Sequence, residues 1–271
     1  MTMLVVAGGK HSPGTTTLAH TIATIAAIHG AGLLVEADPS GGDLAVRTGL
    51  AVDPGLASLT VAARTGLDHQ HLRDHVQTLP SGVEVLVGPV AVRHATSTIA
   101  TIAGPLAALL HADDPGLTVV DVGRVDTADI IGPFLTVADR VLFVTGSGAD
   151  DIASARSRVD LLCDHTRYVT VVATGRDGFG LGAISAALAT PDVVRVPWDP
   201  RAAARVNTGR PLDRWTTRSA YVRAVAQLIR HLTSASTRDT NDEILLAETS
   251  AFSNGLVEAT LDVSMNARRA G

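Results

Sequence analysis

The chain has 271 residues, a length that allows one large domain or two small ones. Apolar residues make up 46% of the sequence but aromatic residues only 3%, so Val, Leu, Ile and Ala must fill the core, as they do in parallel α/β sheets. The net charge of −5 gives no global electrostatic case for nucleic-acid binding, and the single cysteine, Cys163, excludes an intrachain disulfide framework and fits a reducing cytoplasm.

Apolar strands alternate with helical stretches along most of the chain. The predicted strands are Met3–Ala7, Leu33–Glu36, Val83–Val87, Leu117–Asp121, Arg140–Thr145, Tyr168–Thr174 and Val193–Val196. The predicted helices are Thr16–His29, short helices within 43–79, Val92–His111 with a kink at Gly104-Pro105, Thr127–Ala138, Asp150–Cys163, Leu181–Ala189 and a closing amphipathic helix, Thr216–Leu232. This alternation predicts one doubly wound, mostly parallel α/β sheet with helices on both faces.

The composition changes at about Ser234. Residues 234–271 begin with a linker-like run and carry three basic and six acidic residues, so we expect a domain over 1–233 and a disordered or docking tail over 234–271. The tail lacks the basic face of a membrane-binding helix. We also expect no signal peptide, since no basic segment precedes an apolar run, and no spanning helix, since no uncharged apolar run reaches about 18 residues. The protein is therefore expected to be cytoplasmic and not membrane-bound.

Residues 9–16 read GKHSPGTT and join the first predicted strand to the first helix. Such a junction is an anion site, because converging backbone N–H groups and the helix dipole favour a phosphate. Gly9 and Gly14 allow the backbone to approach a ligand closely, and Thr16 stands where a hydroxyl would bind Mg²⁺. The alternative is a plain strand-to-helix turn capped by Thr15 or Thr16. The spacing favours the phosphate site.

Lysine is almost absent from the chain. Of the 22 basic residues, 21 are arginine and one is lysine, Lys10, which lies inside the glycine loop. A GC-rich genome that depletes lysine codons would explain the scarcity by chance. The position of Lys10 favours a required ammonium on a flexible stem, which arginine does not mimic.

The loop resembles the deviant Walker A motif, KGGxGKT[TS], of the ParA/MinD family of partitioning and positioning ATPases. Lys10 matches the signature lysine of that family, Gly14 its glycine, Thr16 its Mg²⁺ threonine and Thr17 the hydroxyl residue that follows. The resemblance implies that Lys10 reaches the phosphates of a partner across a nucleotide-sandwich homodimer.

The loop also departs from the family pattern. His11 and Ser12 replace two glycines, Pro13 takes the variable position, and Thr15 replaces the second lysine, which normally contacts the β- and γ-phosphates. Thr15 can donate one neutral hydrogen bond where the lysine would give a charge-assisted one, so hydrolysis should suffer more than binding. An unperturbed histidine is mostly neutral at pH 7, so His11 is not expected to replace the charge.

Two acidic motifs continue the resemblance. LLVEADPSGGDLA (33–45) resembles the family's strand ending D-x-D-x-Q-G, with Glu36 as the first acid and Asp38 as the acid linked to orienting the attacking water. Alone, Asp38 before a proline is as easily a turn residue. LTVVDVG (117–123) resembles Walker B, in which Asp121 would hold Mg²⁺ through water and Gly123 would let the next loop move with the γ-phosphate.

A later stretch, VPWDPRAAARVNTGRPL (196–212), resembles the family's adenine-side loop. Trp198 or Pro200 would lie against the base, and a buried Trp in an ordinary loop is an equally weighted alternative. At VVATGR (171–176), Gly175 precedes Arg176 where the family usually offers an Asn to the base.

Together the match covers about residues 3–232. It assigns catalytic roles to Lys10 and Asp38 and Mg²⁺ binding to Thr16 and Asp121. The residues it assigns to ATP or ADP are Gly9, Lys10, Pro13, Gly14, Thr15, Thr16, Thr17, Trp198 and Pro200. The expected function is an ATP-binding homodimer that positions or partitions a chromosome, plasmid, division site or pilus machinery, with weak or no hydrolysis and an unidentified protein partner.

Two alternatives stay open: a pseudo-ATPase scaffold that dimerises without nucleotide, and a non-specific DNA-binding partition ATPase. The second would use arginines near the C-terminal end of the domain: Arg201, Arg205, Arg210, Arg214, Arg218 and Arg223. We prefer a solvated face for these arginines. His69, His71 and His75 show no zinc spacing.

Overall fold

The computed structural model describes residues 2–10, 14–30, 32–112, 116–125, 130–166, 168–175, 178–190 and 192–232. Its strands are β1 (Thr2–Gly8), β2 (Gly32–Glu36), β3 (Gln77–Thr78), β4 (Glu84–Leu86), β5 (Leu117–Arg124), β6 (Arg140–Gly146), β7 (Val169–Gly175) and β8 (Val193–Pro197). They form one sheet in the order β3-β4-β2-β5-β1-β6-β7-β8. Every neighbouring pair is parallel except β3–β4, so the carboxyl ends of seven strands meet at one edge.

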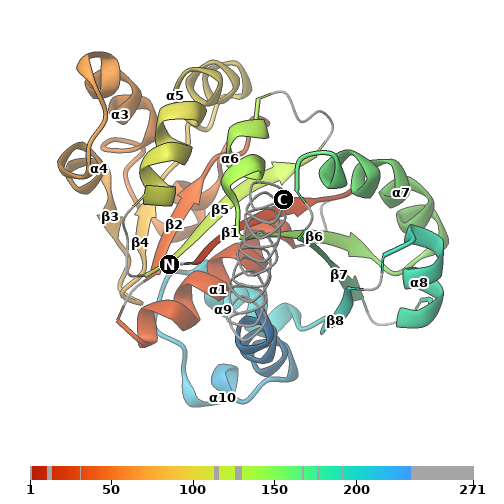
Figure 1. The fold of residues 1–271 in the computed structure, drawn as a ribbon. Coiled ribbons are helices and arrows are strands. Elements are labelled where there is room, and N and C mark those ends of the chain that lie inside the picture. Colours follow the sequence, from red (N-terminus) through yellow and green to blue (C-terminus); the bar gives the residue numbers. More distant parts are fainter. Residues whose placement is uncertain are drawn as a thin grey trace, which may run out of the picture. The chain divides into compact units, whose positions relative to one another are not determined.

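The helices are α1 (Thr15–Ile28), α2 (Leu44–Thr48), α3 (Leu56–Ala62), α4 (His69–His75), α5 (Val92–Ala112), α6 (Gly132–Val137), α7 (Ala149–Cys163), α8 (Leu181–Leu188), α9 (Pro200–Asn207) and α10 (Arg214–Thr217). Residues 220–232 are also helical. Helices α5, α6, α7 and α8 cover one face of the sheet, and α1 and α9 lie on the other (Figure 1).

Alternate strand residues pack into these two layers. Met3 and Val5 of β1 belong to an apolar cluster that includes residues of α3, α5, α6, α7 and α8. The intervening Leu4 and Val6 are equally buried on the face that carries α1. Strands buried on both sides explain the continuous apolar runs in the sequence and confirm the predicted doubly wound, mostly parallel α/β fold.

Three local differences from the predicted elements have physical reasons. The edge strand β3 is only two residues long and leaves no alternation to detect. The described part of the predicted helix 127–138 begins at Gly132, with Pro133 in its first turn, where a missing N–H costs nothing. The predicted closing helix is divided: α10, capped by Asp213, ends at Thr217, and a new helix begins at residue 220, where the Ser219 hydroxyl accepts from the Val222 N–H.

Among the described residues, α5 is the one helix long and apolar enough to cross a membrane by length and composition alone. Its buried apolar residues, including Ile99, Ile102 and Leu106, belong to the core cluster on the sheet. This packing is that of a core helix in a globular domain.

The chain divides into two units, Met1–Ile229 and Arg230–Gly271. Residues 230–232 are the described part of the second unit. The predicted tail, 234–271, lies outside the described residues.

Candidate functional site

The N-terminus of α1 follows β1 directly at the carboxyl edge of the sheet. Gly14 caps the helix with φ of 89°, a left-handed conformation that glycine adopts without strain. On the other side of the loop, the Gly9 N–H donates to the Val144 carbonyl oxygen on β6 at 2.9 Å. The first turn of a helix has N–H groups with no acceptor inside the helix, so this end of α1 can receive an anion.

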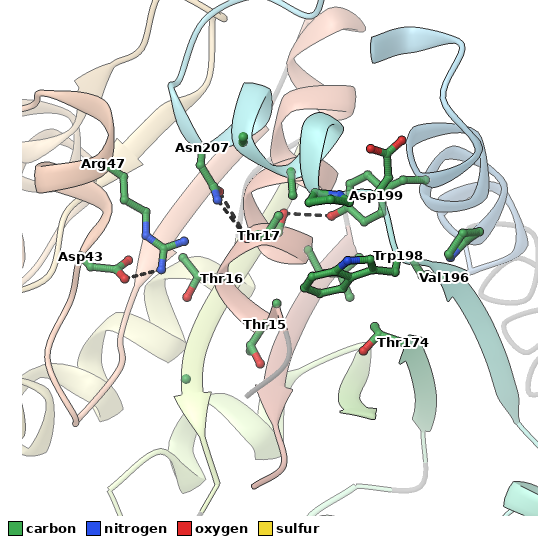
Figure 2. A pocket seen from close by; sticks show the side chains of 18 of the residues that line it. Thr15, Thr16, Thr17, Asp43, Arg47, Thr174, Val196, Trp198, Asp199 and Asn207 are labelled. Atoms are coloured by element: carbon green, nitrogen blue, oxygen red, sulfur yellow. Dashed lines mark hydrogen bonds and ion pairs between the residues drawn. The ribbon is translucent and has the colours of Figure 1, made fainter. Parts of the chain in front are cut away.

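A pocket of about 550 Å³ opens over this first turn (Figure 2). It extends from the start of α1, past the loops that follow β2 and β5, to the ends of β7 and β8 and the inner side of α9. Ligands of doubly wound sheets bind at this edge. Of the residues predicted to act on a nucleotide, those that line the pocket are Gly14, Thr15, Thr16, Thr17, Asp38, Trp198 and Pro200.

Asp121 lies behind the first turn of α1, at the carboxyl end of β5. Its side chain is fully buried, and the Gly123 N–H and the Thr16 hydroxyl donate hydrogen bonds to its carboxylate. Its Oδ2 has no hydrogen-bond partner among the described residues. Burial, with smaller effects from the charges of Glu36 and Asp38, raises the pKa of Asp121 to about 7. An unpaired buried carboxylate oxygen beside a threonine hydroxyl fits a hard divalent cation and its water shell.

The loops after β2 and β5 touch each other through Asp38 and Gly123. Gly123 has φ of 63°, and a β-carbon there would lie 2.0 Å from Cγ and Oδ2 of Asp38. The Ser40 N–H donates to Asp38 Oδ1 at 2.7 Å. Burial raises the pKa of Asp38, and the Asp43 charge adds to this while Arg124 opposes it. Only glycine at position 123 leaves the Asp38 carboxylate in this place.

Glu36 has a structural task. Its Oε1 accepts hydrogen bonds from the N–H groups of Asp43 at 2.7 Å and Leu44 at 2.8 Å, and its Oε2 accepts one from Gly88 at 2.9 Å. The side chain is buried, and that burial raises the pKa of Glu36. Because three backbone donors occupy its oxygens, Glu36 orients the loop that leads into α2 and is not exposed to the pocket.

Thr15 and Thr17 have different surroundings. Thr15 is 2% exposed, and its Oγ1 has no hydrogen-bond partner among the described residues. Thr17 Oγ1 lies 3.2 Å from Asn207 Nδ2, and the Tyr221 hydroxyl donates to the Thr17 carbonyl oxygen at 3.3 Å. The same hydroxyl lies 2.9 Å from Thr21 Oγ1. Thr17 therefore connects α1 to α9 and to the helix that contains Tyr221.

The far end of the pocket is lined mainly by apolar side chains. Trp198 lines it and is 50% exposed, so the alternative of a buried tryptophan is wrong. The Asp199 side chain accepts hydrogen bonds from the N–H groups of Arg201 and Ala202, and Pro200 opens α9. Trp198 and Pro200 therefore both line this end of the pocket.

Several pocket residues have no counterpart in the sequence predictions: Asp43, Arg47, Thr174, Asn207 and Tyr221. Asp43 and Arg47 are spaced as a helical i,i+4 ion pair, a signal that the sequence does contain. Asn207 and Tyr221 are far from Thr17 in the chain, and no local pattern indicates their contacts.

Other predicted residues lie elsewhere. Gly9 and Lys10 belong to the described part of the loop but not to the described pocket lining, and the Lys10 side chain is exposed. His11, Ser12, Pro13 and Arg176 lie outside the described residues. The six C-terminal arginines lie on α9, on α10 and around them, and five of them are exposed. The sixth, Arg205, lies 3.6 Å from an Asp213 oxygen and donates to the Pro211 carbonyl oxygen.

The histidine cluster forms no metal site. His71 pairs with Asp68 at 2.7 Å, and within the described part of the chain no group of three potential metal ligands occurs.

Solved structures with a similar fold include a ParA family ATPase from Chlorobium tepidum TLS, with 17% identity and a TM-score of 0.71 over 85% of this chain and 98% of that protein. The cell division ATPase MinD of Pyrococcus furiosus has 17% identity and a TM-score of 0.67 over 84% and 98%. The septum site-determining protein MinD of Pyrococcus horikoshii OT3, complexed with Mg-ADP, has 16% identity and a TM-score of 0.68 over 87% and 98%. No protein-family model matches the chain, and no curated protein matches it. The fold is therefore that of ParA and MinD ATPases.

Proposed function

We propose that this chain binds Mg-ATP and Mg-ADP, forms a nucleotide-dependent homodimer and positions or partitions a cellular assembly, with slow or no hydrolysis. The observation that carries the proposal is the pocket over the first turn of α1. At one end it offers a helix N-terminus and Asp38, with the buried Asp121 behind that turn, and at the other an exposed indole. A polar end followed by an apolar end matches a phosphate chain followed by a base.

The residues present fit a magnesium nucleotide. Gly14, Thr15 and Thr16 would receive the phosphates through the first turn of α1. The Thr16 hydroxyl would bind the cation, and the unpaired Oδ2 of Asp121 would hold it through water. Bound Mg²⁺–nucleotide would supply the phosphoryl group and neutralise part of its charge.

Hydrolysis is proposed to be slow because of Thr15. By resemblance this position belongs to a lysine, and its Oγ1 offers a neutral donor instead. Asp38 is held beside Gly123 by the Ser40 N–H, where it can orient a water at the end of the phosphate chain. The exposed Lys10 would add charge from a second copy of the chain, so any hydrolysis would depend on dimerisation.

The names of similar structures support this proposal. One MinD structure contains Mg-ADP, and the three proteins are described as ATPases or as proteins of cell division and septum placement. The cargo of this chain is proposed only as a class: a chromosome, a plasmid, the division site or a pilus assembly.

The test is calorimetric titration of Mg-ATP into the full chain, the Thr16→Ala variant and the Thr101→Ala variant. Thr101 is an exposed residue of α5, so the Thr101→Ala substitution removes a hydroxyl of the same kind at a place away from the pocket. We expect Thr16→Ala to weaken Mg-ATP binding by about tenfold or more, since it loses a cation ligand, and Thr101→Ala to bind like the parent chain.

Sedimentation of the same samples, with and without Mg-ATP, tests dimerisation. If the parent chain binds no nucleotide and its fraction of dimer is the same with and without Mg-ATP, the proposed function is wrong and the scaffold alternative replaces it.

A further inference from the structure

We propose that Arg47 supplies, within the same chain, the positive charge for the nucleotide phosphates that the glycine loop does not provide. This role rests on the proposed function and specifies how the same pocket holds a nucleoside di- or triphosphate.

Arg47 is placed at the pocket by α2. It lies in the last turn of this helix and lines the pocket together with Thr15, Thr16 and Thr17. Figure 2 shows its side chain reaching from α2 toward Thr16, on the first turn of α1. The guanidinium is thus directed to the end of the pocket where the helix N-terminus would receive phosphates.

The charge balance of the pocket makes this position informative. Among the described residues that line the pocket, Arg47 alone carries a permanent positive charge, whereas Asp38, Asp43 and Asp199 are acidic. A phosphate chain with several negative charges needs a cation besides Mg²⁺ in such a lining. A guanidinium meets phosphate oxygens with two parallel hydrogen bonds, and these charge-assisted bonds are about twice as strong as neutral ones.

Asp43 holds Arg47 ready for this contact. Asp43 Oδ2 forms an ion pair with Arg47 Nη2, and Asp43 Oδ1 has no hydrogen-bond partner among the described residues. The backbone of Asp43 is itself fixed by its N–H bond to Glu36 Oε1. The pair therefore sits at a defined place on the pocket wall, from which Arg47 can turn to a phosphate.

An ordinary surface ion pair is the competing explanation. The Arg47 and Asp43 side chains are 34% and 48% exposed, and i,i+4 pairs of this kind contribute little to stability. The two explanations differ in what a substitution changes. Loss of a surface pair leaves nucleotide affinity unchanged, whereas loss of a phosphate contact lowers it.

The experiment is calorimetric titration of Mg-ADP, Mg-ATP and adenosine into the full chain and into the Arg47→Ala, Arg47→Lys and Arg73→Ala variants. Arg73→Ala is the matched control. Arg73 is exposed on α4 and contacts Gln70, so this substitution removes the same charge at a place away from the pocket. We expect Arg47→Ala to weaken Mg-ADP and Mg-ATP by about tenfold or more and adenosine by less than about twofold. Arg47→Lys should be intermediate, since it keeps the charge but loses the planar fork.

Arg47 has no such role if Arg47→Ala binds Mg-ADP within about twofold of the parent chain, or if adenosine loses as much affinity as Mg-ADP. A parent chain that binds neither Mg-ADP nor Mg-ATP overturns the proposed function, and this role with it. If the parent chain and the Arg47→Ala variant bind Mg-ADP and Mg-ATP equally well, only the role of Arg47 is overturned and the proposed function stands. Thermal unfolding of each variant identifies any loss that comes from misfolding.

Discussion

Replacing Asp121 by asparagine is expected to stabilise the protein in the absence of metal and nucleotide. Asp121 is fully buried, and burial raises its pKa to about 7 from the ordinary aspartate value of 3.8. An ionised carboxylate at this place therefore costs folding free energy. The Oδ2 atom has no partner among the described residues, so an amide nitrogen in its place gives up no hydrogen bond there.

The size of the effect follows from the shift in pKa. A shift of about 3 units at about 1.4 kcal/mol per unit corresponds to about 4 kcal/mol. Because the folded pKa lies above the unfolded pKa, the folded state binds the extra proton between them. The contribution to stability is complete below the unfolded pKa and is lost as the pH rises through about 7. About 3 kcal/mol of the loss should develop between about pH 5 and about pH 8.

The assay is urea unfolding of the parent chain and the Asp121→Asn variant in EDTA, at about pH 5 and about pH 8. We expect the variant to be more stable than the parent chain at about pH 8. The difference between their free energies of unfolding should be smaller by about 3 kcal/mol at about pH 5. Glu36 and Asp38 also have raised pKa values, so the Asp121→Asn variant should still lose some stability as the pH rises. Parallel pH profiles for the two proteins would refute the assignment of the penalty to Asp121.

Three further substitutions test the same site. Gly123→Ala forces a side chain at φ of 63° against the Asp38 carboxylate, so we expect the free energy of unfolding in urea to fall by about 1–2 kcal/mol. Any ATP hydrolysis should also decrease, because Asp38 is displaced. An unchanged unfolding curve would contradict this geometry. Lys10→Ala should reduce Mg-ATP-dependent dimerisation in sedimentation but leave nucleotide affinity at monomeric concentrations unchanged; normal dimerisation would exclude a contact in trans. Thr15→Lys in the Arg47→Ala background should recover Mg-ADP affinity by about tenfold, and a double variant as weak as Arg47→Ala would show that the two positions do not serve the same phosphates.

The fold was predictable because its main signals are local. Buried parallel strands give continuous apolar runs such as 3–7, and the glycine and threonine pattern places the start of α1 within one residue. The break after α10 was missed because the apolar periodicity of 216–232 continues across it. The start of α10 was missed although Asp213 is a good helix cap.

The site was predictable only in part. Positions on the loops after β1, β2 and β5 follow from strand ends, which meet at one edge of a parallel sheet. The Asn207 and Tyr221 contacts with Thr17 join segments about 190–204 residues apart, and only the folded chain brings them together. Glu36 reads as a site acid in the sequence, and its three backbone hydrogen bonds appear only once 43, 44 and 88 are placed around it.

The three hydrogen bonds of Glu36 also join separate segments of this edge into one support. They attach the chain at 43–44 and at Gly88 to the end of β2, and a β-carbon at Gly42 would lie 2.3 Å from Glu36 Oε2. The segment between these attachments has hydrogen bonds of its own: the Ala37 N–H donates to the Asp121 carbonyl oxygen and the Gly42 N–H to the Pro89 carbonyl oxygen. One buried acid thus positions both the loop that carries Asp38 and the start of the helix that carries Arg47.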